Sequence, residues 1–327
     1  REQALDRCDD DSDAQEEESG CIARAITYHI PRVGGGSRMD GGDKDNDSNI
    51  STILRLSPLP PIDGVWSPVG AHAWYASALL SSLLLSRNTD KRNHHPERLV
   101  DLHKHPFDTL LAARPSSHYT DNNGGKQRTT IIELGSGAVG LSGFVCALAL
   151  QSWLNQLRQE KSAEKGNWRV LLTDNDSSVL EQLRRNLHDN QSTIMPSGSM
   201  VDVEVDAWDW NDEHPASDPL STDDVALVIG SELVYTQETA EACVHLLLCL
   251  LNKHPAMEIW IVQVTDRFGW WDVVVPTLSR NQICVDSIPI LLEHHELAST
   301  MVPMGGTLDR HAYGAFCIHQ QVKSTCK

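Results

Sequence analysis

The chain has 327 residues, with 45 acidic and 27 basic side chains and a formal net charge of -18. This excess of negative charge argues against nucleic acid as the main partner, because phosphate backbones are bound by Lys and Arg. It favours a partner or protein substrate with a basic surface. The longest apolar runs, 78–85 and 244–251, are too short to cross a bilayer, so we expect no association with a membrane.

The 8 cysteines are scattered, and no Cys/His cluster has the spacing of a zinc site. Several cysteines lie in apolar runs, where small buried side chains in a reducing compartment are expected. The acidic start of the sequence is unlike a secretory signal or a mitochondrial transit peptide. We therefore expect no bound metal and a cytoplasmic location, with the nucleus as a second one.

Composition divides the chain into three parts. Residues 1–50 are acidic and polar and are predicted to be mostly disordered, apart from a short strand within 22–33. Residues 51–128 form an N-terminal extension, which includes a flexible insertion at 87–127. The core spans residues 129–327.

In the core, apolar strand-like runs alternate with helical patterns. Strands are predicted at 53–56, 130–134, 169–173, 201–205, 225–229, 259–264, 284–290 and 312–320. Helices are predicted at 73–85, 140–158, 238–252 and 270–279, and one begins with the capping box Ser178-x-x-Glu181. The alternation predicts an α/β fold, a doubly wound, mostly parallel seven-stranded sheet with helices on both faces. The last two strands, joined by a loop and no helix, predict an antiparallel edge.

The strongest motif is a glycine loop between a buried strand and an amphipathic helix. Gly135, Gly137 and Gly140 have the spacing G-x-G-x-x-G, which lets backbone N–H groups and a helix N-terminus approach a ligand. A tight turn without a ligand is the alternative. Glu133, just before the loop, favours S-adenosylmethionine over a pyrophosphate, because a carboxylate attracts its ammonium and sulfonium groups.

Ligands of such sheets bind where the strands end. Asp174 ends the second core strand, where a carboxylate can accept hydrogen bonds from the ribose of either S-adenosylmethionine or NAD; a helix cap is the alternative. Trp208 and Trp210 follow the third strand, and each could contact an adenine or belong to the core. After the fourth strand come Glu232 and Tyr235, whose i, i+3 spacing can direct both toward one cavity.

These residues resemble the seven-β-strand S-adenosylmethionine-dependent methyltransferases, and more narrowly the eukaryotic protein-lysine methyltransferases of methyltransferase family 16. The resemblance covers roughly residues 62–320, and its segments are Val65-Trp66-Ser67-Pro68, 132–141, Leu172-Thr173-Asp174, 229–235 and the tryptophan run 208–212. It implies a Rossmann-like core and a cofactor site lined by Trp66, Gly135, Ser136, Gly137, Asp174, Trp210 and Ser231. Trp210 is chosen over Trp208 because Asp209-Trp210-Asn211-Asp212 aligns best with the family's Asp-Trp-Gly-Asp.

The resemblance also implies the reaction. Glu232 and Tyr235 would hold and orient the amine of a substrate lysine on another protein. The chain departs from the family pattern in three places: Ala138-Val139 replaces Thr-Gly, Asn211 replaces Gly, and Glu232 replaces Asp. Glu at this place resembles the protein-histidine methyltransferases, so histidine is the second candidate target. An NAD-dependent oxidoreductase is a further alternative, which would use the same glycine loop but lacks an evident catalytic Tyr-x-x-x-Lys or a positioned His. A non-catalytic methyltransferase-like scaffold is another, against which the intact glycine loop and Asp174 argue.

Overall fold

A seven-stranded sheet forms the centre of the protein. The computed structural model describes residues 26–30, 52–58, 75–86, 105–107, 110, 128–159, 167–210, 224–266, 269–301 and 312–321. The sheet order is β5-β4-β3-β6-β7-β9-β8. The parallel strands are β3 (Thr129–Leu134), β4 (Trp168–Asp174), β5 (Val201–Ala207), β6 (Asp224–Ser231) and β7 (Glu258–Val264). β9 (Tyr313–Gln320) runs antiparallel between β7 and the edge strand β8 (Ile283–Ile288). The predicted sheet, with its antiparallel strand near one edge, is confirmed.

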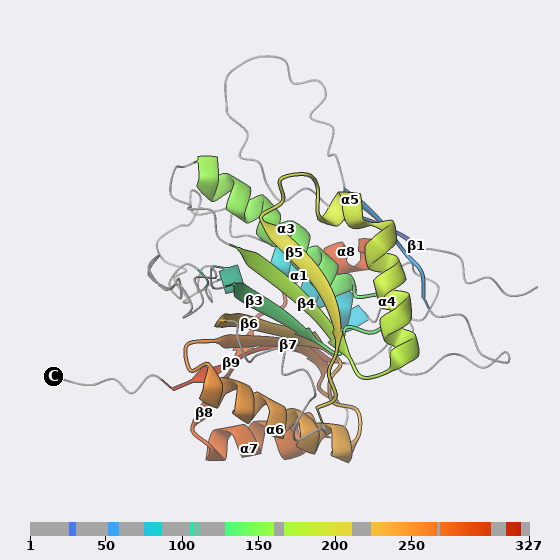
Figure 1. Ribbon diagram of the computed structural model, residues 1–327. Helices are drawn as coiled ribbons and strands as arrows, with labels where there is room; N and C mark the ends of the chain where they lie inside the picture. Colours follow the sequence, from blue (N-terminus) through green and yellow to red (C-terminus); the bar gives the residue numbers. More distant parts are fainter. Residues whose placement is uncertain are drawn as a thin grey trace, which may run out of the picture.

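Helices cover both faces of the sheet, and each face has its own core (Figure 1). One face carries α1 (Tyr75–Leu85), α3 (Leu141–Gln159), α4 (Ser177–Asp189), α5 (Gln191–Ile194) and α8 (Leu292–Met301). The other carries α6 (Gln237–Lys253), the π-turn η2 (Trp270–Val274) and α7 (Val275–Arg280). The central strands are buried on both faces, which is why they read as continuous apolar runs. Among the described helices, none is long and apolar enough to cross a membrane.

A small hairpin from the N-terminal part lies outside the main sheet. β1 (Ile26–Ile30) pairs antiparallel with β2 (Thr52–Leu56), in agreement with the two short strands predicted there. β2 packs against α4 and α5, and β1 packs against α8. The hairpin therefore connects the N-terminal part to helices of the core.

The connection between the last two strands differs from the prediction. The helix α8 lies between β8 and β9, where a loop was expected. Its buried positions are His294, Ala298 and Met301, so the apolar stripe is short and one of its members is a histidine. The His294 ring is hydrogen-bonded on both sides, accepting from the backbone N–H of Leu291 at 2.9 Å and lying 2.9 Å from Oγ of Ser86. A histidine whose two ring nitrogens are hydrogen-bonded can occupy a buried position that is usually apolar. The hydrophobic pattern of the sequence therefore did not indicate this helix.

The predicted capping box Ser178-x-x-Glu181 is wrong. α4 begins at Ser177, and its N-cap is Asp176, two residues before Ser178; the Asp176 side chain accepts from the backbone N–H groups of Ser178 and Val179. Glu181 forms an ion pair with Arg185 one turn along the helix. Aspartate is among the best N-cap residues, and here it takes the place that the sequence assigned to serine.

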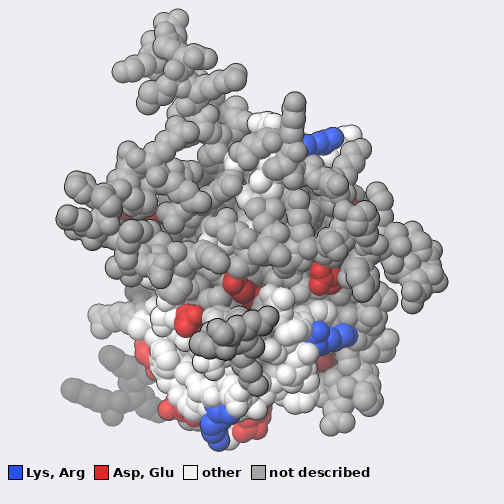
Figure 2. Space-filling view, turned by 90° about the vertical axis from the view of Figure 1, so that its left-hand side faces the viewer, with Lys and Arg blue, Asp and Glu red and all other residues white. Residues whose placement is uncertain are grey.

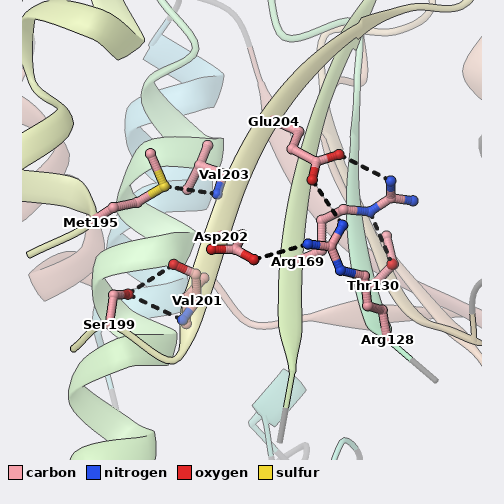
Figure 3. Close-up of polar contacts among 9 residues, drawn as sticks. All are labelled: Arg128, Thr130, Arg169, Met195, Ser199, Val201, Asp202, Val203 and Glu204. Atoms are coloured by element: carbon pink, nitrogen blue, oxygen red, sulfur yellow. Dashed lines mark hydrogen bonds and ion pairs between the residues drawn. The ribbon is translucent and has the colours of Figure 1, made fainter. Parts of the chain in front are cut away.

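Arginines tie β5 to the rest of the sheet (Figure 3). Arg128 bonds Glu204 at 2.9 Å and Asp202 at 3.0 Å, and Arg169 on β4 bonds the other oxygen of Glu204 at 3.2 Å. These side chains are partly exposed, so the network fixes the register of the outer strand more than it adds stability. On the side of the molecule seen in Figure 2, the acidic and basic side chains of the described residues lie interspersed.

Candidate cofactor site

The candidate residues lie at the edge where parallel strands end. From β3 the chain continues outward through β4 and β5, and then returns to place β6 on the other side of β3. The order of the strands therefore reverses between β3 and β6, and the loops after these strands separate there. In open α/β sheets this switch point is where ligands bind.

The glycine loop after β3 has a fixed shape. Gly135, Gly137 and Gly140 have φ angles of +59°, +62° and +60°, a conformation that residues with a side chain rarely adopt. A Cβ atom on Gly140 would lie 2.4 Å from Leu183, so the turn also requires glycine for space. Ser136 fastens the loop to β4: its backbone N–H donates to the carbonyl of Thr173 at 2.8 Å, and its Oγ accepts from the Thr173 N–H at 3.0 Å.

Asp174 joins this loop to the end of β4. Its Oδ2 accepts from the N–H of Gly137 at 3.1 Å, and its Oδ1 accepts from the N–H groups of Asn175 and Asp176 at 2.9 and 3.1 Å. Burial raises the pKa of Asp174, although these three hydrogen bonds oppose the shift. Oδ1 is then fully used, whereas Oδ2 keeps one acceptor position. One ribose hydroxyl can bond there directly, and a second has to share with Gly137. The N-cap of α4 is Asp176, so Asp174 is not the helix cap that the sequence left as an alternative.

Glu133 lies beneath the loop and is almost completely buried. Ser142 of α3 donates to its Oε1 at 2.5 Å, and Ser77 of α1 lies 3.1 Å from the Ser142 hydroxyl. Within the described part of the chain, its other oxygen, Oε2, is left without a hydrogen-bond partner and lies against Gly143. Burial raises the pKa of Glu133 to about 7. The direct contact with a cationic ligand stays a prediction; in the structure Glu133 connects β3 to two helices.

The two tryptophans after β5 have different surroundings. Trp208 is buried in the core, with its backbone N–H bonded to the carbonyl of Asp174 at 2.9 Å. Trp210 is only partly buried, and its ring lies beside Gly135: a Cβ built on that glycine would be 3.6 Å from the ring. Of the two, Trp210 is therefore the one placed next to the glycine loop, and its contact with the cofactor stays a prediction.

The segment after β6 brings Ser231, Glu232 and Tyr235 to the same edge. Ser231 is the last residue of β6 and pairs with Val262 of β7. Glu232 has φ +52°, in the left-handed region, and its Oε1 accepts from the N–H of Val264 at 2.9 Å. This bond turns at least one carboxylate oxygen toward β7. Tyr235 is 45% exposed, and burial followed by the charge of Asp174 raises its pKa.

One residue that the sequence did not single out holds this segment. Gln263 on β7 is completely buried, and its amide bonds both backbone groups of Val234: Oε1 accepts from the N–H at 3.1 Å and Nε2 donates to the carbonyl at 2.8 Å. The only signal was a polar residue within the apolar run Glu258–Val264. Gln263 thereby fixes the residue that precedes Tyr235.

The described part of the site therefore brings together most of the predicted residues. Gly135, Gly137, Asp174 and Trp210 contact one another through the loop, and Ser231 and Tyr235 lie at the same strand ends. Trp66, together with Asn211, lies outside the described residues. Among the described residues, no group of His, Cys, Asp or Glu side chains is arranged to hold a metal ion.

Comparison with known proteins identifies a family that matches this chain. Residues 63–267 match the family described as lysine methyltransferase. No curated protein sequence matches the chain. Similar solved structures include a methyltransferase from Pyrococcus furiosus, at 14% identity, a TM-score of 0.34 and coverage of 70% of this chain and 88% of that chain. The human methyltransferase 10 domain containing protein has 11% identity, a TM-score of 0.32 and coverage of 62% and 76%. An rRNA methylase from Streptococcus thermophilus has 10% identity, a TM-score of 0.34 and coverage of 60% and 88%.

Proposed function

The chain belongs to the lysine methyltransferase family of S-adenosylmethionine-dependent enzymes, and from this premise we propose that it methylates a lysine side chain of another protein. The features that support the proposal lie at one edge of the sheet: Asp174 bonds the glycine loop at the end of β4, and Tyr235 follows the end of β6. Asp174 is thus the carboxylate that would bind the nucleoside, and Tyr235, which is 45% exposed, is the residue that would contact a substrate.

The residues at this edge fit the cofactor. A Cβ built on Gly135 would first meet Leu233 and the Trp210 ring, which offer an apolar surface suited to an adenine. Asp174 supplies an acceptor for a ribose hydroxyl. Bound there, S-adenosylmethionine would supply a methyl group already activated by its sulfonium.

The chain then has to align the nucleophile and exclude water, and it needs little acid–base chemistry. Tyr235 would accept a hydrogen bond from the substrate amine and orient its nitrogen. The carboxylates of Asp174 and Glu232 make the edge negative, which attracts a lysine cation. The same charges stabilise the protonated amine, whose ordinary pKa is about 10.4, so we expect transfer to speed up as the pH rises.

The substrate would be a protein with a basic surface. The net charge of -18 makes long-range attraction to such a partner favourable. Attraction of this kind is screened by salt, so activity on the protein substrate should fall with ionic strength, whereas cofactor binding should change little.

Calorimetric titration with S-adenosylmethionine and with NAD tests the cofactor. We expect heat from S-adenosylmethionine alone. Gly137→Arg should abolish binding, because the side chain fills the loop at a left-handed position. Gly198→Arg is the matched control: Gly198 also has a positive φ, +82°, but a Cβ built there would meet no described atom within 4 Å, and it lies before β5, outside the site. Equal affinity in both variants would contradict the assignment of the loop.

Mass spectrometry of a lysate incubated with labelled S-adenosylmethionine tests the target. Label on lysine supports the proposal, and label on histidine supports the second candidate, which Glu232 in place of the family's Asp favours. The pH profile provides an independent reading. An imidazole is already neutral near pH 7, so a histidine target would give a rate that is flat above about pH 7. A lysine target should give a rate that continues to rise.

A further inference from the structure

Asn186 of α4 is a buried side chain that contacts two segments far from it in sequence. Its Nδ2 donates to the carbonyl of Ala138 in the glycine loop at 2.8 Å and to the carbonyl of Ser57 at 2.9 Å. Its Oδ1 accepts from the N–H of Ser57 at 2.8 Å. Both donors of the amide are used, and the side chain is completely buried.

One turn along α4, Asn190 makes a parallel set of contacts without reaching the loop. Its Oδ1 accepts from the N–H of Arg55 at 2.9 Å, and its Nδ2 donates to the Arg55 carbonyl at 2.7 Å and to the Asn186 carbonyl at 2.8 Å. Arg55 and Ser57 expose the same edge of the chain, since alternate residues of an extended strand do so. The two asparagines thus bind the free edge of β2 as a neighbouring strand would.

We propose that Asn186 is a positioning residue for the cofactor: it holds the glycine loop in its ligand-binding shape and connects that loop to the chain entering from β2. The inference deepens the proposed function and rests on it. The Ala138 carbonyl lies between two left-handed glycines, so without a fixed acceptor bond this part of the loop has other conformations available. Asn186 removes them before a ligand arrives, and binding then loses less conformational entropy.

Ser57 gives the contact a second consequence. The segment that follows Ser57 in sequence leads to Trp66, which the family resemblance assigns to the cofactor. Asn186 therefore fixes the start of that segment and the glycine loop with one amide group. A ligand that binds the loop is expected to tighten the Ser57 contact as well, because both depend on the same side chain.

The test compares Asn186→Ala with Asn190→Ala. Each variant removes a buried amide from α4 or its C-cap together with two hydrogen bonds to a backbone group pair at the end of β2, Ser57 for Asn186 and Arg55 for Asn190, but only the first removes the bond to the glycine loop. We expect similar losses in melting temperature without ligand. The Kd for S-adenosylmethionine should rise about tenfold or more in Asn186→Ala, the loss expected for one preorganising hydrogen bond, and stay within about twofold in Asn190→Ala. Equal Kd changes in the two variants would overturn the inference.

Hydrogen–deuterium exchange of the wild-type chain gives a test that does not depend on either variant folding. Adding S-adenosylmethionine should slow exchange in a peptide spanning 52–58 together with the loop, while a peptide spanning β8 should not change. Unchanged exchange at 52–58 would count against the coupling. If the wild type does not bind S-adenosylmethionine, both the proposed function and the inference fail. If the wild type binds it but Asn186→Ala and Asn190→Ala have the same Kd, only the inference fails.

Discussion

The backbone N–H of Gly137 donates a hydrogen bond to Oδ2 of Asp174 at 3.1 Å, which joins the glycine loop of one strand to the carboxylate of the next. Asp174→Ala should therefore remove a ribose acceptor and loosen the loop together. We expect weaker binding of S-adenosylmethionine by about 1.5–3 kcal/mol, the range for hydrogen bonds to a charged group. Calorimetry measures the loss.

Asp176 supplies the control for that variant. Asp176→Ala removes the cap of α4 and should cost about 1 kcal/mol of stability with little change in affinity. The reverse outcome, in which Asp174→Ala melts early and binds normally, would assign Asp174 to structure alone.

Glu133 should make stability depend on pH. Its pKa is about 7 in the folded chain against an ordinary value of 4.5, so folding takes up a proton between these values. Its stabilising contribution is complete below about pH 4.5 and is lost as the pH rises through about 7. A shift of this size corresponds to about 3 kcal/mol. Urea unfolding between pH 4.5 and pH 8 should show the wild type losing this much relative to Glu133→Gln, which keeps an acceptor for Ser142. Parallel pH curves for the two proteins would mean that Glu133 does not titrate in this window.

Tyr235 and Glu232 should separate transfer from cofactor binding. Tyr235→Phe removes only the half-exposed hydroxyl, so we expect unchanged affinity for S-adenosylmethionine and loss of most methyl transfer. Glu232→Ala should do the same and in addition destabilise the fold by about 1–3 kcal/mol, because the Val264 N–H loses its acceptor. Glu232→Gln keeps an acceptor for the Val264 N–H, so it separates the loss of methyl transfer from the loss of stability. Turnover with labelled cofactor measures transfer, and full activity in Tyr235→Phe and Glu232→Ala would remove both residues from the site.

Gln263 should matter for the shape of the segment after β6. Gln263→Met fills a similar volume but leaves the N–H and carbonyl of Val234 without their partners, at a cost of about 2–4 kcal/mol for two unsatisfied buried groups. The matched control is Gln320→Met, which removes one bond to the Leu251 carbonyl at the end of α6, away from the site. Denaturant unfolding compares the two variants. Equal losses in the free energy of unfolding would mean that the two hydrogen bonds to Val234 stabilise the protein no more than the single bond of Gln320.

The sheet could be predicted from the sequence because its central strands are apolar on both faces, so Thr129–Leu134 and Asp224–Ser231 appear as continuous runs. The glycine loop and Asp174 follow these runs directly, and their position needs only the rule for parallel strands. The helix α8 could not be predicted in this way, since His294 takes an apolar position only with partners supplied by other elements.

The contacts that support the site could not be predicted from the sequence either. Asn186 and Gln263 act through bonds to residues far away in the chain, and Ser142 connects Glu133 with the distant Ser77; each is an ordinary residue in its local pattern. The left-handed φ of Glu232 is likewise set by its contacts with β7, because a non-glycine residue does not favour that conformation by itself. Local patterns locate strands and loops, whereas the tertiary contacts decide which side chains hold the loops in place.

The position of β9 between β7 and β8 has a consequence for synthesis on the ribosome. β8 emerges before β9, yet within the described sheet β9 is its only strand partner, and β7 has an open edge until β9 arrives. An open strand edge offers unpaired N–H and carbonyl groups to any neighbouring chain. A nascent chain that pauses after β8 is therefore exposed to aggregation, and its sheet can close only when the residues of β9 have left the exit tunnel.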